Sequence, residues 1–177
     1  MMLRTLLRLA GDRRGSAAME MAMVTPLLLI LMFGSVELGN YFWNEHTLLK
    51  AVRDGARFAA RQSFNSFSTC SSAGTDLSSA TVGSDTKKVV QKGSLDSSQP
   101  DLLPNWSTAT FKLTATCATT QVGGQTMSGL YKNDPNGWTK VTVETTLTYR
   151  PVLAVALGFS GVGYQLYGRS EAAVTGL

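Results

Sequence analysis

The sequence predicts an α+β fold: a long N-terminal helix, partly transmembrane, followed by a small head with a short helix and a three-stranded antiparallel sheet. Two observations carry this prediction. Residues 21–36 form an uncharged apolar run that passes without a break into a helical apolar pattern. Nearer the C-terminus, three segments alternate apolar and polar residues with a period of two, which is typical of half-buried strands.

The length of 177 residues suits one domain plus an appendage. We expect a basic leader, a long helix that crosses the membrane over about 16–38, a Ser/Thr-rich loop with a short helix, and the sheet of the head. The expected bounds of these four parts are 1–15, 16–62, 63–105 and 106–177.

Positive charge is concentrated at the N-terminus. The chain has 16 Lys and Arg against 12 Asp and Glu, and residues 1–15 alone hold four Arg against one Asp. The arginines directly precede the apolar run, whereas residues 37–48 contain no Lys or Arg, so the positive-inside rule places the N-terminus in the cytoplasm and the head outside. This distribution argues for a leader and against a nucleic-acid-binding surface.

The apolar run contains two residues that call for an explanation. A helix over 16–36 measures ~31 Å, close to the thickness of a bilayer core, and it places Glu20 inside the bilayer or at its edge. A carboxylate there is costly and is a functional candidate, the alternative being a position near the lipid headgroups. Pro26 removes a backbone N–H and predicts a helix kink.

Two other interpretations of the N-terminus stay open. One is a secretory signal peptide cleaved near Gly34 and Ser35, which would release a secreted binding module. The position of Glu20 between the basic and apolar segments, and the unbroken helical pattern, count against it. The other is a signal-anchored protein with an unrelated head.

The helix continues beyond the apolar run with an apolar face and a basic face. The apolar face combines the row Phe42, Leu49 and Ala56 with the row Glu45, Val52 and Ala59. The basic face is a ridge of Lys50, Arg53, Arg57 and Arg61. This ridge is either a solvated face or a stripe of subunit contacts. The candidate subunit contacts of the helix are Arg53 and Arg57 from the ridge and, nearer the N-terminus, Glu37.

The three strands are expected over 110–118, 139–149 and 163–174, with a turn at 133–137 between the first two. Phe111, Leu113, Ala115 and Cys117 share one face of the first strand, and Val141, Val143, Thr145, Leu147 and Tyr149 share one face of the second. In the third strand the corresponding face is Leu166, Gly168, Ser170, Ala172 and Val174.

Two shorter segments complete the head. Residues 85–93 predict a short helix capped by Ser84 or Asp85 and stopped by Gly93. Arg150-Pro151 ends the second strand. The apolar segment 152–159 is too short to span a bilayer and predicts a short buried helix or a strand extension, or else an exposed apolar contact for a partner.

The chain has two cysteines, Cys70 and Cys117. In an oxidising compartment they would form one disulfide, closing a loop of about 47 residues and contributing roughly 4 kcal/mol. The alternative is two unrelated buried thiols. The single histidine, His46, has no recognisable partner, and no catalytic or nucleotide-binding motif is present. We therefore expect no enzyme activity, metal, cofactor or small-molecule substrate.

An ordered set of residues runs from the leader into the second half of the helix. With this set, residues 13–60 resemble the TadE-like family of tight-adherence (Flp-type) pilus assembly proteins, the minor pseudopilins. The set consists of Arg13-Arg14-Gly15, Ala18, Glu20, Pro26, Gly34, Glu37, Gly39, Gly55-Ala56-Arg57 and Ala59-Ala60.

The resemblance implies a pilin-like, single-pass protein of the bacterial inner membrane that takes part in assembling pili used for adhesion, biofilm formation or secretion. Its implied partners are other pilins and pseudopilins, the inner-membrane assembly platform and a prepilin peptidase. Cleavage of the Gly15–Ser16 bond would leave Glu20 as the fifth residue, the spacing found in some members of the family. Met21 stands where such sites often have Tyr.

Overall fold

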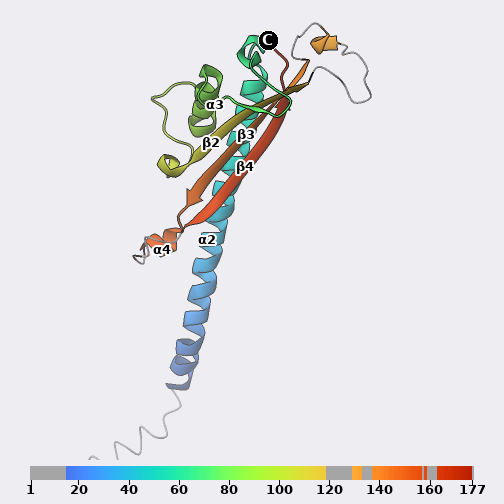
Figure 1. The fold of residues 1–177 in the computed structure, drawn as a ribbon. Helices are drawn as coiled ribbons and strands as arrows, with labels where there is room; N and C mark the ends of the chain where they lie inside the picture. The colour runs from blue at the N-terminus through green and yellow to red at the C-terminus, as the bar shows by residue number, and fades with distance from the viewer. Residues whose placement is uncertain (1–14, 119–128, 133–136, 157, 159–162, 177) are drawn as a thin grey trace, which may run out of the picture. The chain divides into compact units, whose positions relative to one another are not determined.

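The computed structural model describes residues 15–118, 129–132, 137–156, 158 and 163–176. It confirms an α+β fold with a long N-terminal helix, a short helix and an antiparallel sheet (Figure 1). The helices are α2 (Gly15–Ala60), α3 (Thr81–Lys92) and α4 (Val152–Ala156), and the strands are β1 (Thr75–Asp76), β2 (Thr110–Ala118), β3 (Trp138–Tyr149) and β4 (Tyr164–Ala173). Short 3-10 helices are η1 (Phe64–Phe67), η2 (Trp106–Thr108) and η3 (Gly129–Tyr131).

The chain divides into two compact units, one ending at Asn40 and one beginning at Tyr41. The described part of the first unit is the helix over 15–40. Its residues 21–36 are all exposed, and the helix continues through Pro26. Near this proline, the Thr25 hydroxyl donates a hydrogen bond to the carbonyl of Met21 at 2.6 Å. The kink predicted at Pro26 stays a prediction.

The second unit is built on a sheet with the strand order β1-β2-β3-β4, antiparallel throughout. The prediction of three strands was one short, because β1 pairs with β2 through Thr75 opposite Ala115. This strand is two residues long and lies in the Ser/Thr-rich segment, so it has no period-two pattern to reveal it.

The predicted inner faces of the strands are confirmed. Leu113, Val143 and Leu166 are almost fully buried, and β3 alternates buried and half-buried residues toward Tyr149, where it ends before Arg150 as expected. The second half of α2 packs against this face at β4, where a Cβ on Gly168 would lie 3.0 Å from the Val52 side chain. Glycine therefore allows the helix to approach the strand closely.

The predicted apolar face of α2 was partly wrong. Val52, Ala56 and Ala59 are buried as expected, but Phe42 is 47% exposed. The core face is rotated from the predicted rows, so that Tyr41 rather than Phe42 continues it and packs against Tyr149 with ring centroids 5.4 Å apart. The buried residues of this face are Asn44, Leu48, Ala51, Val52, Gly55, Ala56, Ala59 and Ala60.

The short helix α3 begins four residues earlier than predicted, with Ala80 rather than Ser84 or Asp85 at its N-cap. The buried residues Val82, Thr86 and Val90 are spaced by four, so burial of this face extends the helix toward its N-terminus. The predicted end is confirmed: Gly93 adopts φ 69°, and its N–H donates to the carbonyl of Val89.

The segment after β3 forms the short predicted helix, α4, but it is not buried. Val152 and Val155 are 60% and 53% exposed, which corrects the expectation of a buried element. Of the predicted turn, 133–136 lies outside the described residues, and Gly137 has φ 69°.

Candidate functional site

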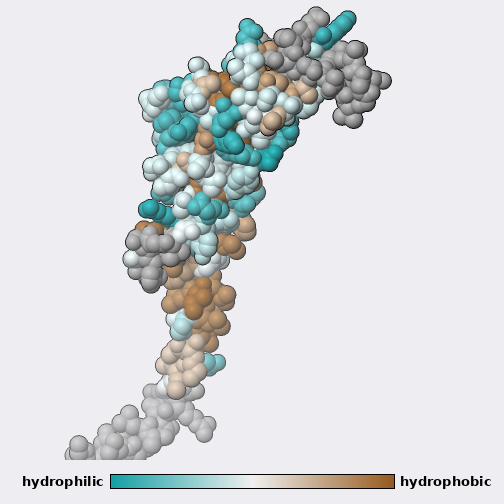
Figure 2. Space-filling model, viewed as in Figure 1, coloured by the Kyte–Doolittle hydropathy of each residue, from teal (hydrophilic) through white to brown (hydrophobic). Residues whose placement is uncertain are grey.

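The apolar half of α2 is the first candidate. Within the described part of the chain, α2 is the helix long and apolar enough to cross a membrane. Figure 2 shows hydrophobic residues gathered along it. Membrane anchors and signal sequences share this length and composition. A buried core helix shares them too, but residues 21–36 are exposed to solvent rather than packed against other described residues.

The predicted processing and charge residues lie at the beginning of this helix. Gly15 is the first residue of α2, and Glu20 follows five residues later, about 7.5 Å along the axis. The Glu20 side chain is exposed and has no ion-pair partner among the described residues.

The basic ridge on the second half of α2 is exposed. Arg53 and Arg57, two of the predicted subunit contacts, point to solvent, and the third, Glu37, is half-buried in the first unit. A shallow groove of about 460 Å³ lies beside the ridge. It is lined by Trp43, His46, Thr47, Lys50, Ala51, Asp54, Gly93 and Leu102.

The groove offers little for chemistry. His46 lines the groove together with Asp54 and Lys50. The residues that line the groove include no Ser or Cys that could act as a nucleophile beside an imidazole base. Among the described residues there is no group of three His, Cys, Asp or Glu side chains that could hold a metal ion.

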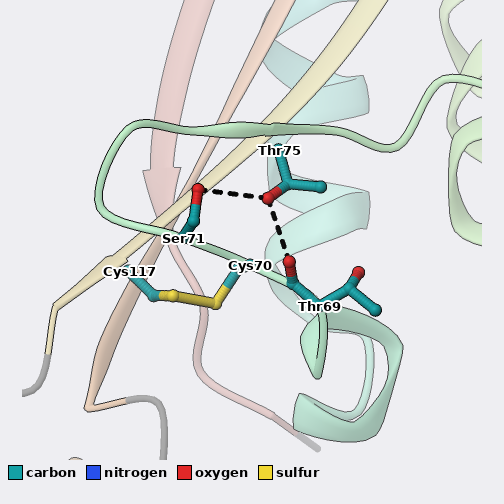
Figure 3. Close-up of a disulfide and its surroundings, with 5 residues drawn as sticks. All are labelled: Thr69, Cys70, Ser71, Thr75 and Cys117. Atoms are coloured by element: carbon teal, nitrogen blue, oxygen red, sulfur yellow. Dashed lines mark hydrogen bonds between the residues drawn. A yellow bond between two sulfur atoms is a disulfide. The ribbon is translucent and has the colours of Figure 1, made fainter.

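The disulfide between Cys70 and Cys117 is formed, as predicted, with Cα atoms 5.8 Å apart. It joins the segment after η1 to the end of β2 (Figure 3). One hydrogen bond supports the same link, because the N–H of Cys117 donates to the carbonyl of Ser71. A second bond ties the segment to β1, where the Thr75 hydroxyl donates to the carbonyl of Thr69. The Ser/Thr-rich loop is therefore held to the sheet by covalent and polar contacts.

An ion-pair cluster on the outer face of the sheet was missed at the sequence level. Glu171 lies 2.6 Å from Arg169 and 2.9 Å from Lys140, and Arg169 reaches Glu144 at 3.4 Å. The hydrogen bonds from Arg169 and then Lys140 lower the pKa of Glu171 to about 2. Arg169 and Glu171 are neighbours on one face of β4, but Lys140 and Glu144 reach them only through the β3–β4 register, which the separate strand patterns do not supply.

The two halves of α2 and the sheet together define a class. An exposed apolar N-terminal helix that continues into a small antiparallel sheet domain is a pilin-like α+β arrangement. Within that class, residues 15–57 match the family model described as TadE-like protein, which confirms the resemblance over this segment. No curated protein and no solved structure matches the chain.

Proposed function

We propose that the protein is a membrane-anchored minor pseudopilin that takes part in assembling Tad/Flp-type pili. The observation that carries the proposal is the family match at 15–57, which covers the apolar half of α2 and most of its packed half. Proteins of this family are generally structural components rather than enzymes.

The proposed topology has a cytoplasmic N-terminus, one span over about 16–38 and an extracytoplasmic head. The arginines before the span and their absence just after it support this orientation. The disulfide supports it independently, because disulfides form and persist in oxidising compartments such as the periplasm.

Glu20 is proposed to guide assembly. Cleavage after Gly15 by a prepilin peptidase would create an amine at Ser16, and Glu20 would neutralise the amine of a neighbouring subunit in the bundle. A neighbour in another register would leave both charges unpaired at low dielectric, so the pair would favour one register. Glu37, Arg53 and Arg57 are proposed as further contacts with other pilins or with the assembly platform.

Intact mass and N-terminal sequencing of the protein from bacterial membranes test the proposal. A chain beginning at Ser16 supports prepilin-type processing. A chain beginning near residues 35–40 would identify a secreted module and contradict the anchor. A chain beginning at Met1 or Met2 would contradict the role of Glu20 while leaving a bitopic anchor, for which co-purification with the pilus machinery decides the function.

The role of Glu20 has its own test. Glu20→Ala is expected to leave membrane insertion intact and to reduce pilus assembly, because the neighbouring amine loses its partner. Met19→Ala, one residue away and also exposed, is the matched control and should assemble normally. Normal assembly by Glu20→Ala would remove this role.

A further inference from the structure

A set of exposed aromatic and aliphatic side chains lies at the end of the second unit where the chain continues from Asn40. We call this set the basal belt. Its exposed fractions range from 47% at Phe42 to 74% at Trp43, high for side chains of this kind. The belt consists of Phe42, Trp43, Val152, Val155 and Tyr164.

Contacts within the second unit place the strand ends that flank α4 beside the first residue of the unit. The ring of Tyr41, the first residue of the unit, packs against Tyr149 at the end of β3 and against Phe42, with centroids 5.4 and 5.8 Å apart. Tyr149 in turn is paired with Tyr164 at the beginning of β4. The connection between these two strands, which carries α4, therefore begins and ends beside Tyr41.

The helix supplies the rest of the belt. Phe42 and Trp43 follow Tyr41 directly, so they lie within about 3 Å of it along the axis of α2 and face other directions around it. Val152 and Val155 are three residues apart on α4, which places them on one side of that helix. Arg150, exposed just before α4, adds a positive charge at the same end.

We propose that the basal belt is a lipid-contact surface: α4 and the surrounding aromatic residues lie in the headgroup region of the bilayer. This inference rests on the proposed function, since it requires the apolar half of α2 to span the membrane. Tyr and Trp favour the membrane–water interface. Moving exposed valines from water into the apolar edge of that interface lowers the free energy. Arg150 would bind lipid phosphates.

A lipid surface fits this belt better than a protein partner does. In the sequence, Phe42 and Trp43 of the belt follow an uncharged run of 16 residues, 21–36, after only five residues, 37–41. At 1.5 Å per residue, those five residues advance about 7.5 Å, which is roughly the depth of the headgroup layer. The chain would then contact the membrane at two places, the span and α4.

The opposite end of the sheet provides a matched control. Leu130 lies on η3 in the β2–β3 connection, whereas α4 lies in the β3–β4 connection, so the two are at opposite ends of β3. Leu130 is 56% exposed, close to the 53% of Val155. Both positions tolerate a larger side chain because they face solvent.

The test introduces a fluorescent probe at each position in the full-length chain. Val155→Trp and Leu130→Trp are reconstituted in vesicles of phosphatidylethanolamine and phosphatidylglycerol whose acyl chains carry bromine near the headgroup. The emission of the introduced tryptophan is obtained by subtracting the emission of the unsubstituted chain. This emission is expected to be quenched severalfold more in Val155→Trp than in Leu130→Trp. Adding Val152→Asp to Val155→Trp should weaken the quenching by removing part of the apolar contact.

Carbonate extraction of the same vesicles separates the two proposals. Equal quenching in both variants, with the chain resistant to extraction, would overturn the lipid contact of the belt and leave the membrane anchor standing. A chain extracted by carbonate would overturn the anchor itself, and this inference with it.

Discussion

The two halves of α2 are one helix with opposite relations to their surroundings. Residues 21–36 are apolar and exposed on all sides, whereas the residues after Tyr41 bury one face and expose a basic one. A helix that is apolar all round needs an apolar surrounding, and one with a single apolar stripe needs a core on one side. The difference shows that one helix carries two patterns, an all-round apolar surface in the first unit and a single core-facing stripe in the second.

Removing the disulfide should have the largest effect on stability, and this effect should be confined to the second unit. Replacing Cys70 and Cys117 with Ser should lower the free energy of unfolding of the head by about 4 kcal/mol, because the closed loop is long. Thermal unfolding followed by near-UV circular dichroism in detergent measures this. A change below about 1 kcal/mol would mean that the hydrogen bonds between this loop and β2 hold it without the covalent bond.

A pair of identical substitutions sharpens the comparison along one helix. Leu48→Ala, at a side chain with 0% exposure, should cost about 3 kcal/mol of unfolding free energy because it leaves a cavity. Leu31→Ala, at a side chain with 62% exposure, should leave the unfolding of the head unchanged. Equal losses in denaturant titrations in detergent would contradict the division into two environments.

Glycines on the two halves should also respond differently. A Cβ on Gly55 would collide with the Val90 side chain of α3, so Gly55→Ala should destabilise the head by about 2 kcal/mol through overpacking. At Gly39, an added Cβ would have no described atom within 4 Å apart from the adjoining residues and backbone of α2, and Gly39→Ala should be neutral or slightly stabilising. Thermal unfolding of both variants decides whether α3 packs this closely.

The ion-pair cluster gives the smallest effect and a pH signature. Because the folded-state pKa of Glu171 is lowered from 4.5 to about 2, its stabilisation is present above pH 4.5 and is lost as pH falls toward 2. Glu171→Gln should therefore cost about 1 kcal/mol at pH 7, given the exposure of the pair, and progressively less below pH 4.5.

The control for this prediction is Asp85→Asn, which removes a half-buried pair with Lys88 within one helix and should cost only a few tenths of a kcal/mol. A Glu171→Gln difference that stayed constant from pH 7 to pH 2.5 would contradict a contribution from the charged form of Glu171.

The sequence was most informative where structure is specified locally. The alternation through Leu113 and Val143 predicted the inner faces of the strands, and Gly93 marked the end of α3, because side-chain period and glycine conformation are local properties. The apolar run likewise predicted the exposed half of α2.

The features that were missed depend on partners distant in sequence. β1 exists only because it pairs with β2, and the Glu171 cluster requires the β3–β4 register. The buried face of α2 is set by its contacts with Gly168 and Tyr149, which a heptad pattern cannot anticipate. The exposure of α4 is of the same kind, since an apolar pentapeptide does not reveal whether a neighbour covers it.

The lysines of the chain provide the most direct test of the central claim, that an anchored helix carries an extracytoplasmic head. All seven lysines, from Lys50 to Lys140, lie in the second unit, and none precedes residue 41. An amine-reactive reagent that cannot cross membranes is applied to intact spheroplasts, and labelled lysines of the membrane-bound protein are identified by mass spectrometry. We expect labelling of the head without permeabilisation. Labelling that appears only after permeabilisation would contradict the extracytoplasmic head.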